Sequence, residues 1–506
     1  MKITGSRATE ETGENLKAVH HWAAFLVSAA DRRRAVHYRE KGVRMVSLQS
    51  EVVSELRSKV KGEVLLPGES GYDAARTIWN AMIDRKPAII VRCAAVEDIV
   101  HSLALGRDHG LLVSVKGAGH NIAGNAVCDG GLMIDLSAMN SVQVDPETRR
   151  ANVAPGATLA NFDHEAQRYG LATPLGINST TGVAGLTLGG GFGWLTRKYG
   201  MTVDNLISAD VITADGILLR ASDQENQELF WAIRGGGGNF GVVTNFEFKL
   251  HSVGPEVLSG LIVFPFDQAQ DLLKKYQEYV DQIPEELSVW AVMRHAPPLP
   301  FLPPEVHGKM VVVFPFIHLG DIEEGRRAIE PLRNFAQPYG EHIGLQPFTA
   351  WQKTFDPLLA PGARNYWKSH NFVTLSDGAI EALVAYAGRL PGPQCEIFIG
   401  LISGQANRVA PEATAYAHRN IKYVLNVHCR WEQPQDDTRF ISWAREFFNA
   451  TASFATGGVY VNFLTQDETD RTQAAYGANY KRLVQLKQTY DPNNLFRMNQ
   501  NIKPSL

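Results

Sequence analysis

Three glycine-rich segments carry the strongest chemical signal in the sequence. The first, residues 116–121 (KGAGHN), follows a short apolar stretch, the second covers residues 182–193, and the third covers residues 234–243. Glycine tolerates positive φ, so consecutive amides in such a segment can turn toward one point and hold a phosphate or diphosphate. The first segment also contains His120, whose imidazole a rigid loop could place beside a ligand. For this segment alone, a tight structural turn with a hydrogen-bonded histidine is the alternative.

Together, the three segments predict an extended ligand rather than a single phosphate group. A run of glycines lacks side-chain packing and loses more conformational entropy on folding than other residues. Such a run is expected where the backbone must lie directly against a flat ring. FAD fits, because it combines a diphosphate, a sugar chain and flat rings. The first segment is neither a GxGxxG fingerprint that opens a helix nor a GK[ST] phosphate loop.

The composition is that of a folded protein whose charges nearly balance, so that it has no strong net electrostatic field. The length of 506 residues suggests roughly two to four domains. Hydrophobic residues make up 44% and charged residues 20%, which excludes a mainly disordered chain. The 49 basic and 53 acidic residues nearly balance, so neither nucleic acid nor an acidic membrane is an expected partner. The four cysteines form no CxxC pair and no apolar run is long enough for a membrane span, so we expect a cytoplasmic protein with neither a metal site nor a disulfide framework.

A rhythm of strands and helices begins near residue 87 and positions the glycine segments. Apolar strands are expected at 88–91 and 111–115, with a helix between them. Residues 131–136 and 142–144 alternate like a hairpin, with a turn in Asp145-Pro146. Thr158 can cap a following helix, and Asp215-Gly216 predicts a second hairpin turn.

The pattern changes near Gly254-Pro255, where longer strands begin to alternate with longer amphipathic helices. This predicts an antiparallel sheet covered by helices on one face, and the fold class is therefore α+β. Asp321 with Glu324 fits a helix cap. Near the end, we expect an ordered segment at 459–463 and a helix at 471–488.

Four motifs together give the chain a family resemblance. They are VKGAGHNIAGNAV at 115–127, GLATPLGINSTTGVAGLTLGGGFGWLTRKYG at 170–200, FWAIRGGGGNFGVVTNFEF at 230–248 and YDPNNLFRMNQNIKP at 490–504. From about residue 60 onward, the sequence resembles berberine bridge enzyme-like FAD-linked oxidases, part of the superfamily that includes vanillyl-alcohol oxidase.

The resemblance implies a PCMH-type FAD-binding domain built from two α+β parts, and a substrate domain on an antiparallel sheet. We therefore assign residues 45–253 to the FAD-binding domain and 254–450 to the substrate-binding domain. Residues 451–506 would return to the FAD domain. Residues 1–44 read as an N-terminal extension, either poorly ordered or a helix packed on the surface.

The resemblance also implies roles for single residues. His120 matches the histidine that bonds covalently to the flavin 8α-methyl group. Asn178 stands where many relatives carry a cysteine linked to flavin C6, so we expect FAD with a single covalent link, and Cys128 reads as a core residue. Thr181 occupies a position that influences oxygen access and favours an oxidase. Tyr460 matches a tyrosine that acts as a base on the substrate, or else packs against the flavin ring.

A base of this type needs activation, because free tyrosine has a pKa of about 10. Lys368 is a possible helper, and Tyr366 is a second candidate catalytic residue. The remaining residues that the motifs assign to the cofactor site are Lys116, Gly117, Ala118, Gly119, Asn121, Asn125, Gly176, Gly182, Gly185, Leu186, Gly189, Gly241, Val242, Asn499 and Asn501.

The expected activity is removal of hydride from a C–H next to an alcohol or amine of a small molecule, a sugar or secondary metabolite. O2 would be the acceptor and hydrogen peroxide the product. Trp351, Trp367 and Trp431 are aromatic candidates for a substrate pocket, although core packing is the commoner role. The alternatives are a dehydrogenase with another acceptor, a non-catalytic flavin-binding protein, and a sugar-nucleotide reductase that uses NADPH and non-covalent FAD.

Overall fold

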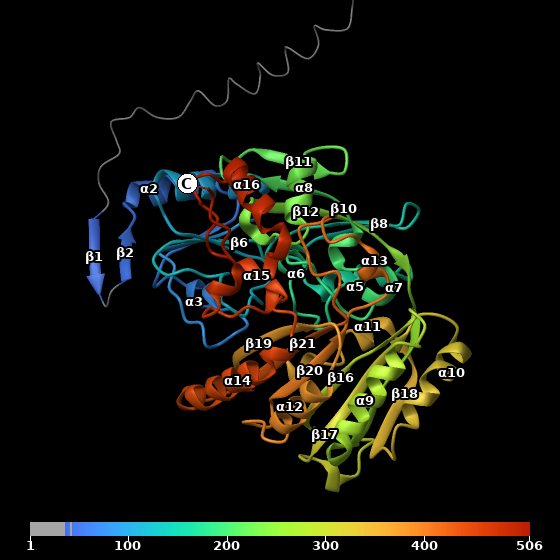
Figure 1. The fold of residues 1–506 in the computed structure, drawn as a ribbon. Coiled ribbons are helices and arrows are strands. Elements are labelled where there is room, and N and C mark those ends of the chain that lie inside the picture. Colours follow the sequence, from blue (N-terminus) through green and yellow to red (C-terminus); the bar gives the residue numbers. More distant parts are fainter. Residues whose placement is uncertain (1–35, 41–42, 506) are drawn as a thin grey trace, which may run out of the picture.

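The computed structural model describes residues 36–40 and 43–505 of the chain, and three sheets organise most of them (Figure 1). Most of the expected extension at 1–44 therefore lies outside the described residues. Its described part contributes β1 (Val36–Glu40), which pairs with β2 (Val43–Ser47) in an antiparallel ribbon. Helix α2 (Ser50–Lys59) follows this ribbon.

The first sheet has four strands in the order β3-β4-β6-β5. Their bounds are Glu63–Leu65 (β3), Ile89–Arg92 (β4), Val113–Lys116 (β5) and Leu132–Asp135 (β6), with α3 (Tyr72–Arg76) and α4 (Val96–Asp108) beside them. Strands β4 and β5 both run parallel to β6. The hairpin expected between 131–136 and 142–144 is therefore wrong: all four β6 residues are buried, as in a central parallel strand covered on both faces.

The second sheet has five strands in the order β11-β10-β12-β8-β7. The bounds are Val142–Asp145 (β7), Arg150–Val153 (β8), Leu206–Ile212 (β10), Leu218–Ser222 (β11) and Val242–Lys249 (β12). The Asp145-Pro146 turn joins β7 to β8 instead, and the hairpin across Asp215-Gly216 joins β10 to β11 as predicted. The Thr158 hydroxyl accepts a hydrogen bond from the Asn161 amide at 3.3 Å and caps α5 (Leu159–Gln167), which confirms that prediction.

Short elements connect this sheet to the glycine segments. They are β9 (Leu171–Ala172), α6 (Val183–Leu188), α7 (Thr196–Tyr199), α8 (Gln227–Ile233) and β13 (His251–Ser252). Strand β13 pairs with β9. Helix α6 lies inside the second glycine segment, so that segment is partly helical.

The third sheet has eight strands in the order β18-β14-β17-β16-β20-β21-β19, with β15 also paired to β17. The strands are Glu256–Pro265 (β14), Leu287–Val289 (β15), Ala291–His295 (β16), Met310–His318 (β17), Gly340–Pro347 (β18), Arg364–Phe372 (β19), Glu396–Leu401 (β20) and Tyr423–Trp431 (β21). All of its pairings are antiparallel. The α+β fold with an antiparallel sheet is thus confirmed.

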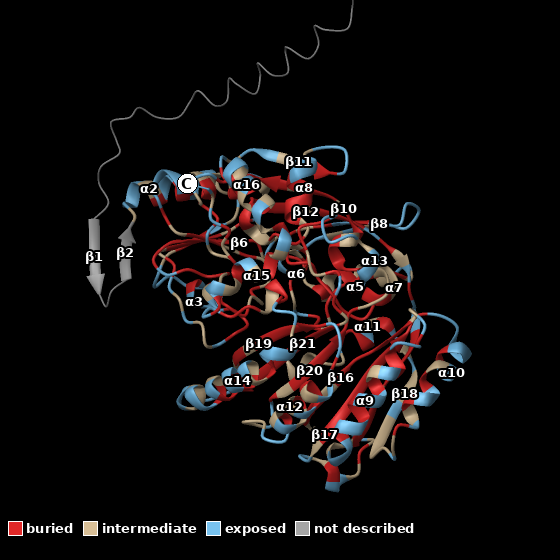
Figure 2. Ribbon diagram, in the orientation of Figure 1, coloured by how far each residue is buried: buried red, intermediate tan, exposed pale blue. Residues whose placement is uncertain are grey.

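Helices cover one face of this sheet. They are α9 (Ala269–Val280), α10 (Ile322–Arg333), α12 (Asp377–Ala387) and α14 (Asp437–Thr451), with the shorter α11 (Phe348–Trp351) and α13 (Gln405–Arg408) at the boundary with the other sheets. The Asp321 carboxylate accepts from the Glu324 amide at 2.9 Å and caps α10, as expected. Figure 2 shows buried strands beneath helices whose outward sides are exposed.

Strand β21 shows how the sheet presents two different faces. Successive side chains of a strand point to opposite faces. The helix-side residues include Tyr423, whose ring contacts Tyr276 of α9, and Trp431, which stacks on Phe440 of α14 at 4.8 Å. The intervening side chains Asn426, His428 and Arg430 are polar although buried, and they face away from these helices.

The last residues return to the two smaller sheets, as Figure 1 shows by the red ribbon beside β6 and β12. The helix expected at 471–488 is divided into α15 (Thr472–Tyr476) and α16 (Tyr480–Tyr490), because Gly477 adopts a positive φ of 54° between them. Residues 461–463 form a short 3-10 helix. In α16, the buried Lys487 ammonium bonds to Asp491 at 2.7 Å and to the Asn239 carbonyl at 2.8 Å, which ties this segment to the third glycine segment.

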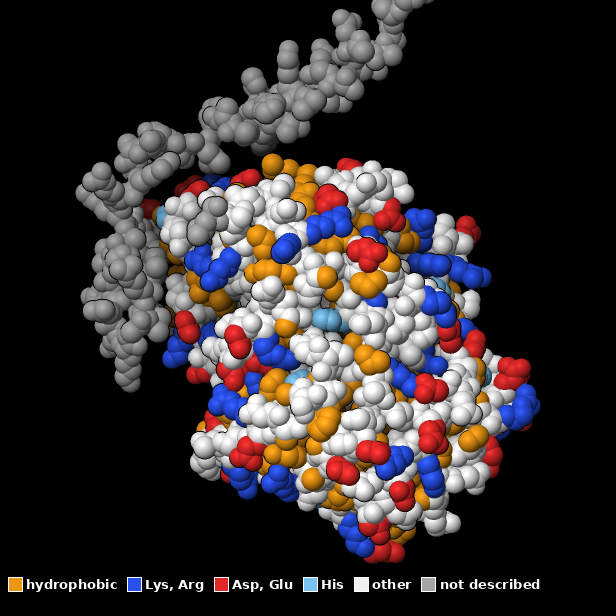
Figure 3. Space-filling model, viewed as in Figure 1, with side chains coloured by type: hydrophobic (Ala, Val, Ile, Leu, Met, Phe, Trp, Pro, Cys, Tyr) orange, Lys and Arg blue, Asp and Glu red, His pale blue; other side chains and the backbone are white. Residues whose placement is uncertain are grey.

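The surface mixes charges of both signs. Figure 3 shows basic and acidic side chains interspersed over the visible face, in keeping with the near balance in the sequence. Within residues 36–40 and 43–505, no helix is long and apolar enough to cross a bilayer.

Candidate functional site

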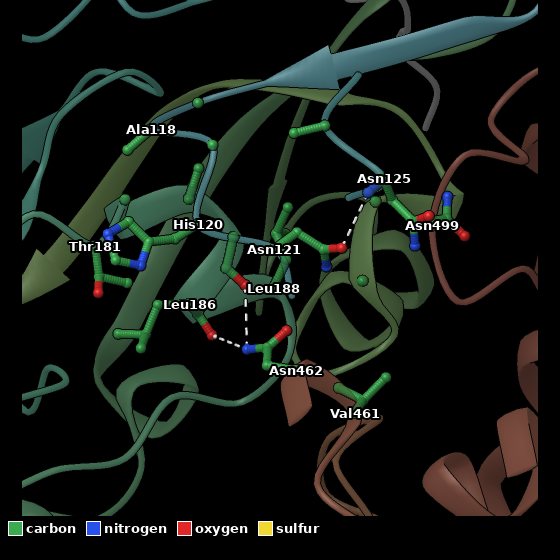
Figure 4. A pocket seen from close by; sticks show the side chains of 18 of the residues that line it. Ala118, His120, Asn121, Asn125, Thr181, Leu186, Leu188, Val461, Asn462 and Asn499 are labelled. Atoms are coloured by element: carbon green, nitrogen blue, oxygen red, sulfur yellow. Dashed lines mark hydrogen bonds between the residues drawn. The ribbon is translucent and has the colours of Figure 1, made fainter. Parts of the chain in front are cut away.

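A cavity of about 310 Å³ lies where the three sheets and the C-terminal segment meet. All three glycine segments contribute to its wall, together with Asn499 and Gln500 and with side chains from the eight-stranded sheet. Segments far apart in the sequence therefore form one continuous space. Figure 4 shows its polar side chains, including Asn121, Asn125, Asn499 and Asn462.

The first glycine segment lines the cavity with Gly117, Ala118, Gly119, His120 and Asn121. Gly119 has a φ of 74°, so a residue with a side chain would be strained at this turn. The Asn121 carboxamide oxygen accepts a hydrogen bond from the Asn125 amide at 3.1 Å and holds the loop (Figure 4).

Lys116 does not line the cavity. It is the last residue of β5, and its ammonium bonds to the Ala75 carbonyl at 2.7 Å and lies 3.6 Å from the Asp135 carboxylate. The side chain of this predicted cofactor residue is buried beneath the first glycine segment, where its Cε would lie 3.5 Å from a Cβ atom built on Gly119.

The second segment and the residues before it contribute Gly176, Asn178, Thr181, Gly182, Gly185 and Leu186, all predicted cofactor residues. A Cβ atom built on Gly185 would meet no atom within 4 Å, so its backbone faces open space. Gly189 is different, because a Cβ there would lie 2.3 Å from the Asn462 side chain. Gly189, also a predicted cofactor residue, is thus required by packing against Asn462 and is not among the residues that line the cavity.

The third glycine segment and the C-terminal residues form another part of the cavity wall. Gly241, Val242 and Asn499 line the cavity as expected, next to Gly237 and Gly238, which were not predicted individually. Asn501 does not line it. The chain there is held by the neighbouring Ile502 amide, which donates to the Asn239 side chain at 2.9 Å.

Two of the unpartnered buried polar atoms around the cavity belong to Asn178, next to the second glycine segment, and to Asn499, in the C-terminal segment. Neither the Asn178 Nδ2 donor nor the Asn499 Oδ1 acceptor is hydrogen-bonded within the described part of the chain. Buried polar groups are nearly always satisfied in folded proteins. Together with the open backbone at Gly185 and Gly238, they fit a long ligand with both donors and acceptors.

His120 is held in one tautomer by a short chain of hydrogen bonds. The Asn178 Oδ1 acceptor receives the Thr180 amide at 3.0 Å and the Thr180 hydroxyl at 2.6 Å. Because that hydroxyl donates its only hydrogen to Asn178, its oxygen must accept from His120 Nε2–H, which lies 2.7 Å away. His120 Nδ1 therefore carries a lone pair.

The surroundings of His120 also keep it uncharged. Its ring stacks on Trp79, with centroids 4.9 Å apart and planes inclined by 24°. Burial lowers the pKa of His120 to about 4, so the imidazole is neutral near pH 7. A neutral imidazole with a free lone pair is the nucleophilic form of histidine.

Tyr460 also lines the cavity, but it is not prepared as a base. Its oxygen accepts hydrogen bonds from the Gly191 amide and from Asn462 Nδ2, both at 3.0 Å. Burial raises the pKa of Tyr460 to about 12 despite these two donors. The phenol is therefore protonated near neutrality and its own hydrogen remains free to be donated.

Lys368 and Tyr366, the expected helpers, lie on the other face of β19 and do not line the cavity. The Lys368 ammonium pairs with Glu468 at 3.2 Å, and the Tyr366 hydroxyl donates to Asp467 at 2.7 Å. Burial, followed by the Asp467 carboxylate, raises the pKa of Tyr366. The structure thus places Tyr366, a predicted catalytic residue, in an ion-pair network outside the cavity.

The eight-stranded sheet forms the remaining wall with Trp290, Trp367, Phe398 and His428. Only Trp367 was among the aromatic candidates. Trp351 packs on Trp194 at 5.1 Å in the core, and Trp431 stacks on α14. Sequence reasoning missed His428, although polar residues at every second position of 423–431 were a signal for it.

His428 is linked to two charged residues behind the wall. Its Nδ1 lies 2.9 Å from Glu396 Oε1, and Arg294 Nη1 donates to Glu396 Oε2 at 2.7 Å. Burial alone would raise the pKa of Glu396, but Arg294 and His428 outweigh it and lower that pKa to about 2. The carboxylate is ionised, so His428 Nδ1 carries a hydrogen.

Comparison with known proteins identifies two family regions. Residues 87–222 match the FAD binding domain, and residues 459–503 match the berberine and berberine-like family. A FAD-linked oxidoreductase of Dictyostelium discoideum is 32% identical over 461 residues, which cover 90% of this chain and 97% of that protein.

Solved structures show the same fold. The crystal structure of 6-hydroxy-D-nicotine oxidase from Arthrobacter nicotinovorans has a TM-score of 0.79 and 28% identity, covering 88% of this chain and 98% of that one. Xylooligosaccharide oxidase from Myceliophthora thermophila, in complex with xylobiose, also has a TM-score of 0.79, with 25% identity and coverages of 90% and 99%.

Proposed function

The chain belongs to the berberine and berberine-like family of FAD-linked oxidoreductases, and on this premise we propose that it is an oxidase of small molecules. The reaction would convert an alcohol to a carbonyl compound, or an amine to an imine. Bound in the cavity, FAD would accept the hydride from the substrate and pass the electrons to O2, which becomes hydrogen peroxide. The relatives named as oxidases support this choice of acceptor.

The glycine segments would hold FAD along its length. The first and second segments surround His120 at one part of the cavity, while Gly241, Val242 and Asn499 line another part. The unpartnered Asn178 and Asn499 atoms would supply hydrogen bonds to it. In this arrangement, residues 45–253 and 451–506 form the cofactor domain, and 254–450 form the substrate wall.

A single covalent link would join the cofactor to His120. The free lone pair on Nδ1 makes this atom the point of attachment, because Nε2 donates to Thr180. Asn178 has no thiol and cannot form a thioether with the ring. Cys128 is buried in the core and its sulfur lies 3.5 Å from the Leu132 carbonyl, so it is not a substitute.

Thr181 supports the oxidase assignment. It lines the cavity with a small β-branched side chain, which leaves space for O2 to approach. A dehydrogenase with another acceptor is the alternative that the experiment must separate.

The observation that carries the proposal is the continuity of the cavity from the glycine segments to the aromatic wall of the large sheet. The purified protein should be precipitated with acid and the pellet inspected for yellow colour. It should then be incubated in air with benzyl alcohol, benzylamine, cyclohexylmethanol and D-xylose while peroxide is measured. Colour in the pellet and peroxide with one compound are expected. A colourless preparation would refute the flavoprotein, and reduction of the flavin without peroxide would refute the oxidase.

A further inference from the structure

We propose that His428 binds the reacting hydroxyl or amine of the substrate and accepts its proton, and that this substrate carries an aromatic ring. The inference rests on the proposed oxidase function and specifies its substrate class. His428 belongs to the large sheet and not to the glycine segments, so the proposal concerns the wall that this sheet contributes to the cavity.

The position of His428 is fixed by the register of three strands. Glu396 of β20 lies directly opposite His428 of β21, and Arg294 of β16 lies directly opposite Glu396. The side chains of such directly paired residues project to the same face of a sheet. Both oxygens of the Glu396 carboxylate are therefore engaged, one by Arg294 and the other by His428.

This arrangement leaves one atom of His428 without a partner. Because Nδ1–H donates to Glu396, Nε2 is the ring nitrogen that carries the lone pair when the imidazole holds a single hydrogen. Nε2 is buried and makes no hydrogen bond to any residue that the structure describes. The residue is 7% exposed and lines the cavity. A buried acceptor of this kind calls for a donor from a ligand.

The surroundings of His428 select a ring rather than a sugar. Its imidazole stacks on Trp367, with ring centroids 4.7 Å apart. The ring of Phe398 lies 5.7 Å from the imidazole and 4.9 Å from the ring of Trp290. Among the described residues that line the cavity, none is an Asp, Glu, Lys or Arg. A sugar has several hydroxyls to satisfy, and each one buried without a partner costs about 1–3 kcal/mol. The polar side-chain atoms of this aromatic wall that bond to no described residue are the His428 Nε2 acceptor and the indole N–H groups of Trp290 and Trp367. One strong acceptor among aromatic faces suits a flat ring that carries one reacting group.

The proton balance follows from the same contacts. The O–H or N–H bond of the substrate breaks, and an N–H bond forms at Nε2. The imidazolium that results is stabilised by the Glu396 carboxylate at Nδ1. The hydride leaves the neighbouring carbon for the FAD that the family activity supplies, and the product is a carbonyl compound or an imine. Tyr460 is less suited to this step, because its oxygen already accepts two hydrogen bonds.

The test compares the holoenzyme with His428→Phe and His428→Gln. Phenylalanine retains a flat ring against Trp367 but has no acceptor, and glutamine retains an acceptor but takes no proton near neutrality. His370→Phe is a matched control, because His370 is also a buried histidine stacked on an aromatic ring, Phe448, at 4.1 Å, and it does not line the cavity. Flavin content and melting temperature are measured first for every variant.

Binding of benzyl alcohol, cyclohexylmethanol and D-xylose to the holoenzyme is then measured by calorimetry. We expect benzyl alcohol to bind at least tenfold more tightly than either of the others, and His428→Phe to weaken it about tenfold. With the panel compound that reduces the flavin, His428→Gln should lower the rate of a single turnover at least a hundredfold. The control should behave as the unmodified protein in both measurements.

Two results would overturn the inference while leaving the oxidase intact. One is a flavin-loaded His428→Phe that binds benzyl alcohol as tightly as the unmodified protein. The other is tighter binding of D-xylose than of benzyl alcohol. A protein without flavin would instead refute the proposed function itself, so the two failures are distinguishable. If His428→Phe does not fold, His428→Gln gives the deciding measurement.

Discussion

The attachment of FAD to His120 should tolerate acidity far better than an ordinary histidine would allow. Apoprotein produced under riboflavin limitation is mixed with FAD between pH 5 and 7, and covalent flavin is quantified by its fluorescence after denaturing electrophoresis. Only neutral imidazole can react, and the pKa of His120 is lowered to about 4 by burial. At pH 5, about 90% of such a side chain is neutral, against about 3% for a histidine with the usual pKa of about 6.5.

The expected rate of attachment is therefore nearly constant from pH 7 to pH 5. A pKa near 6.5 would instead reduce it about twenty-five-fold over this range, and a fall of that size would refute the reasoning about burial. Thr180→Val removes the acceptor that fixes the Nε2–H tautomer. At about 1 kcal/mol for one hydrogen bond, it should slow attachment roughly fivefold, whereas Thr181→Val leaves the Asn178–Thr180–His120 chain in place and should have little effect.

Three further predictions concern Gly185 in the cavity wall, the buried Lys487–Asp491 ion pair and the Tyr460 hydroxyl. Gly185→Leu should fold normally yet lower the flavin content several-fold, because its side chain would enter open cavity space; equal flavin per protein by absorbance would contradict this. Lys487→Met should reduce the free energy of unfolding by about 3–5 kcal/mol in urea titrations, because Asp491 remains as an unpaired buried charge. Lys481→Met, at an exposed position of the same helix, is its control. Equal urea midpoints for Lys487→Met and the unmodified protein would contradict a stabilising role of the Lys487–Asp491 pair. Tyr460→Phe should preserve covalent flavin and lower turnover less than His428→Gln does; the reverse order would restore Tyr460 as the base.

The glycine segments could be recognised from the sequence because their chemistry is local. Consecutive amides and His120 belong to one loop, so the residue types alone indicate what they can hold. Other placements could not be predicted from the sequence, because residues that are adjacent in the sequence can point in different directions. Lys116 adjoins the first segment but ends a strand and turns inward, and Tyr366 alternates with Trp367 to the opposite face of β19.

The pair of Glu396 and His428 could not be predicted from the sequence. The two residues are separated by more than thirty positions in the sequence, and only the register of β20 against β21 brings them together. The alternation of polar and apolar residues in 423–431 indicates two faces, but it does not tell which strand lies beside it. That information comes from the packing of the whole sheet.

The return of the C-terminal segment has a consequence for biosynthesis. Asn499 and Gln500 complete the cavity wall beside Gly237 and Gly238, which leave the ribosome much earlier. This part of the cavity wall is therefore complete only after Asn499 and Gln500 have been synthesised. Premature termination before Asn499 should yield a product with less bound flavin.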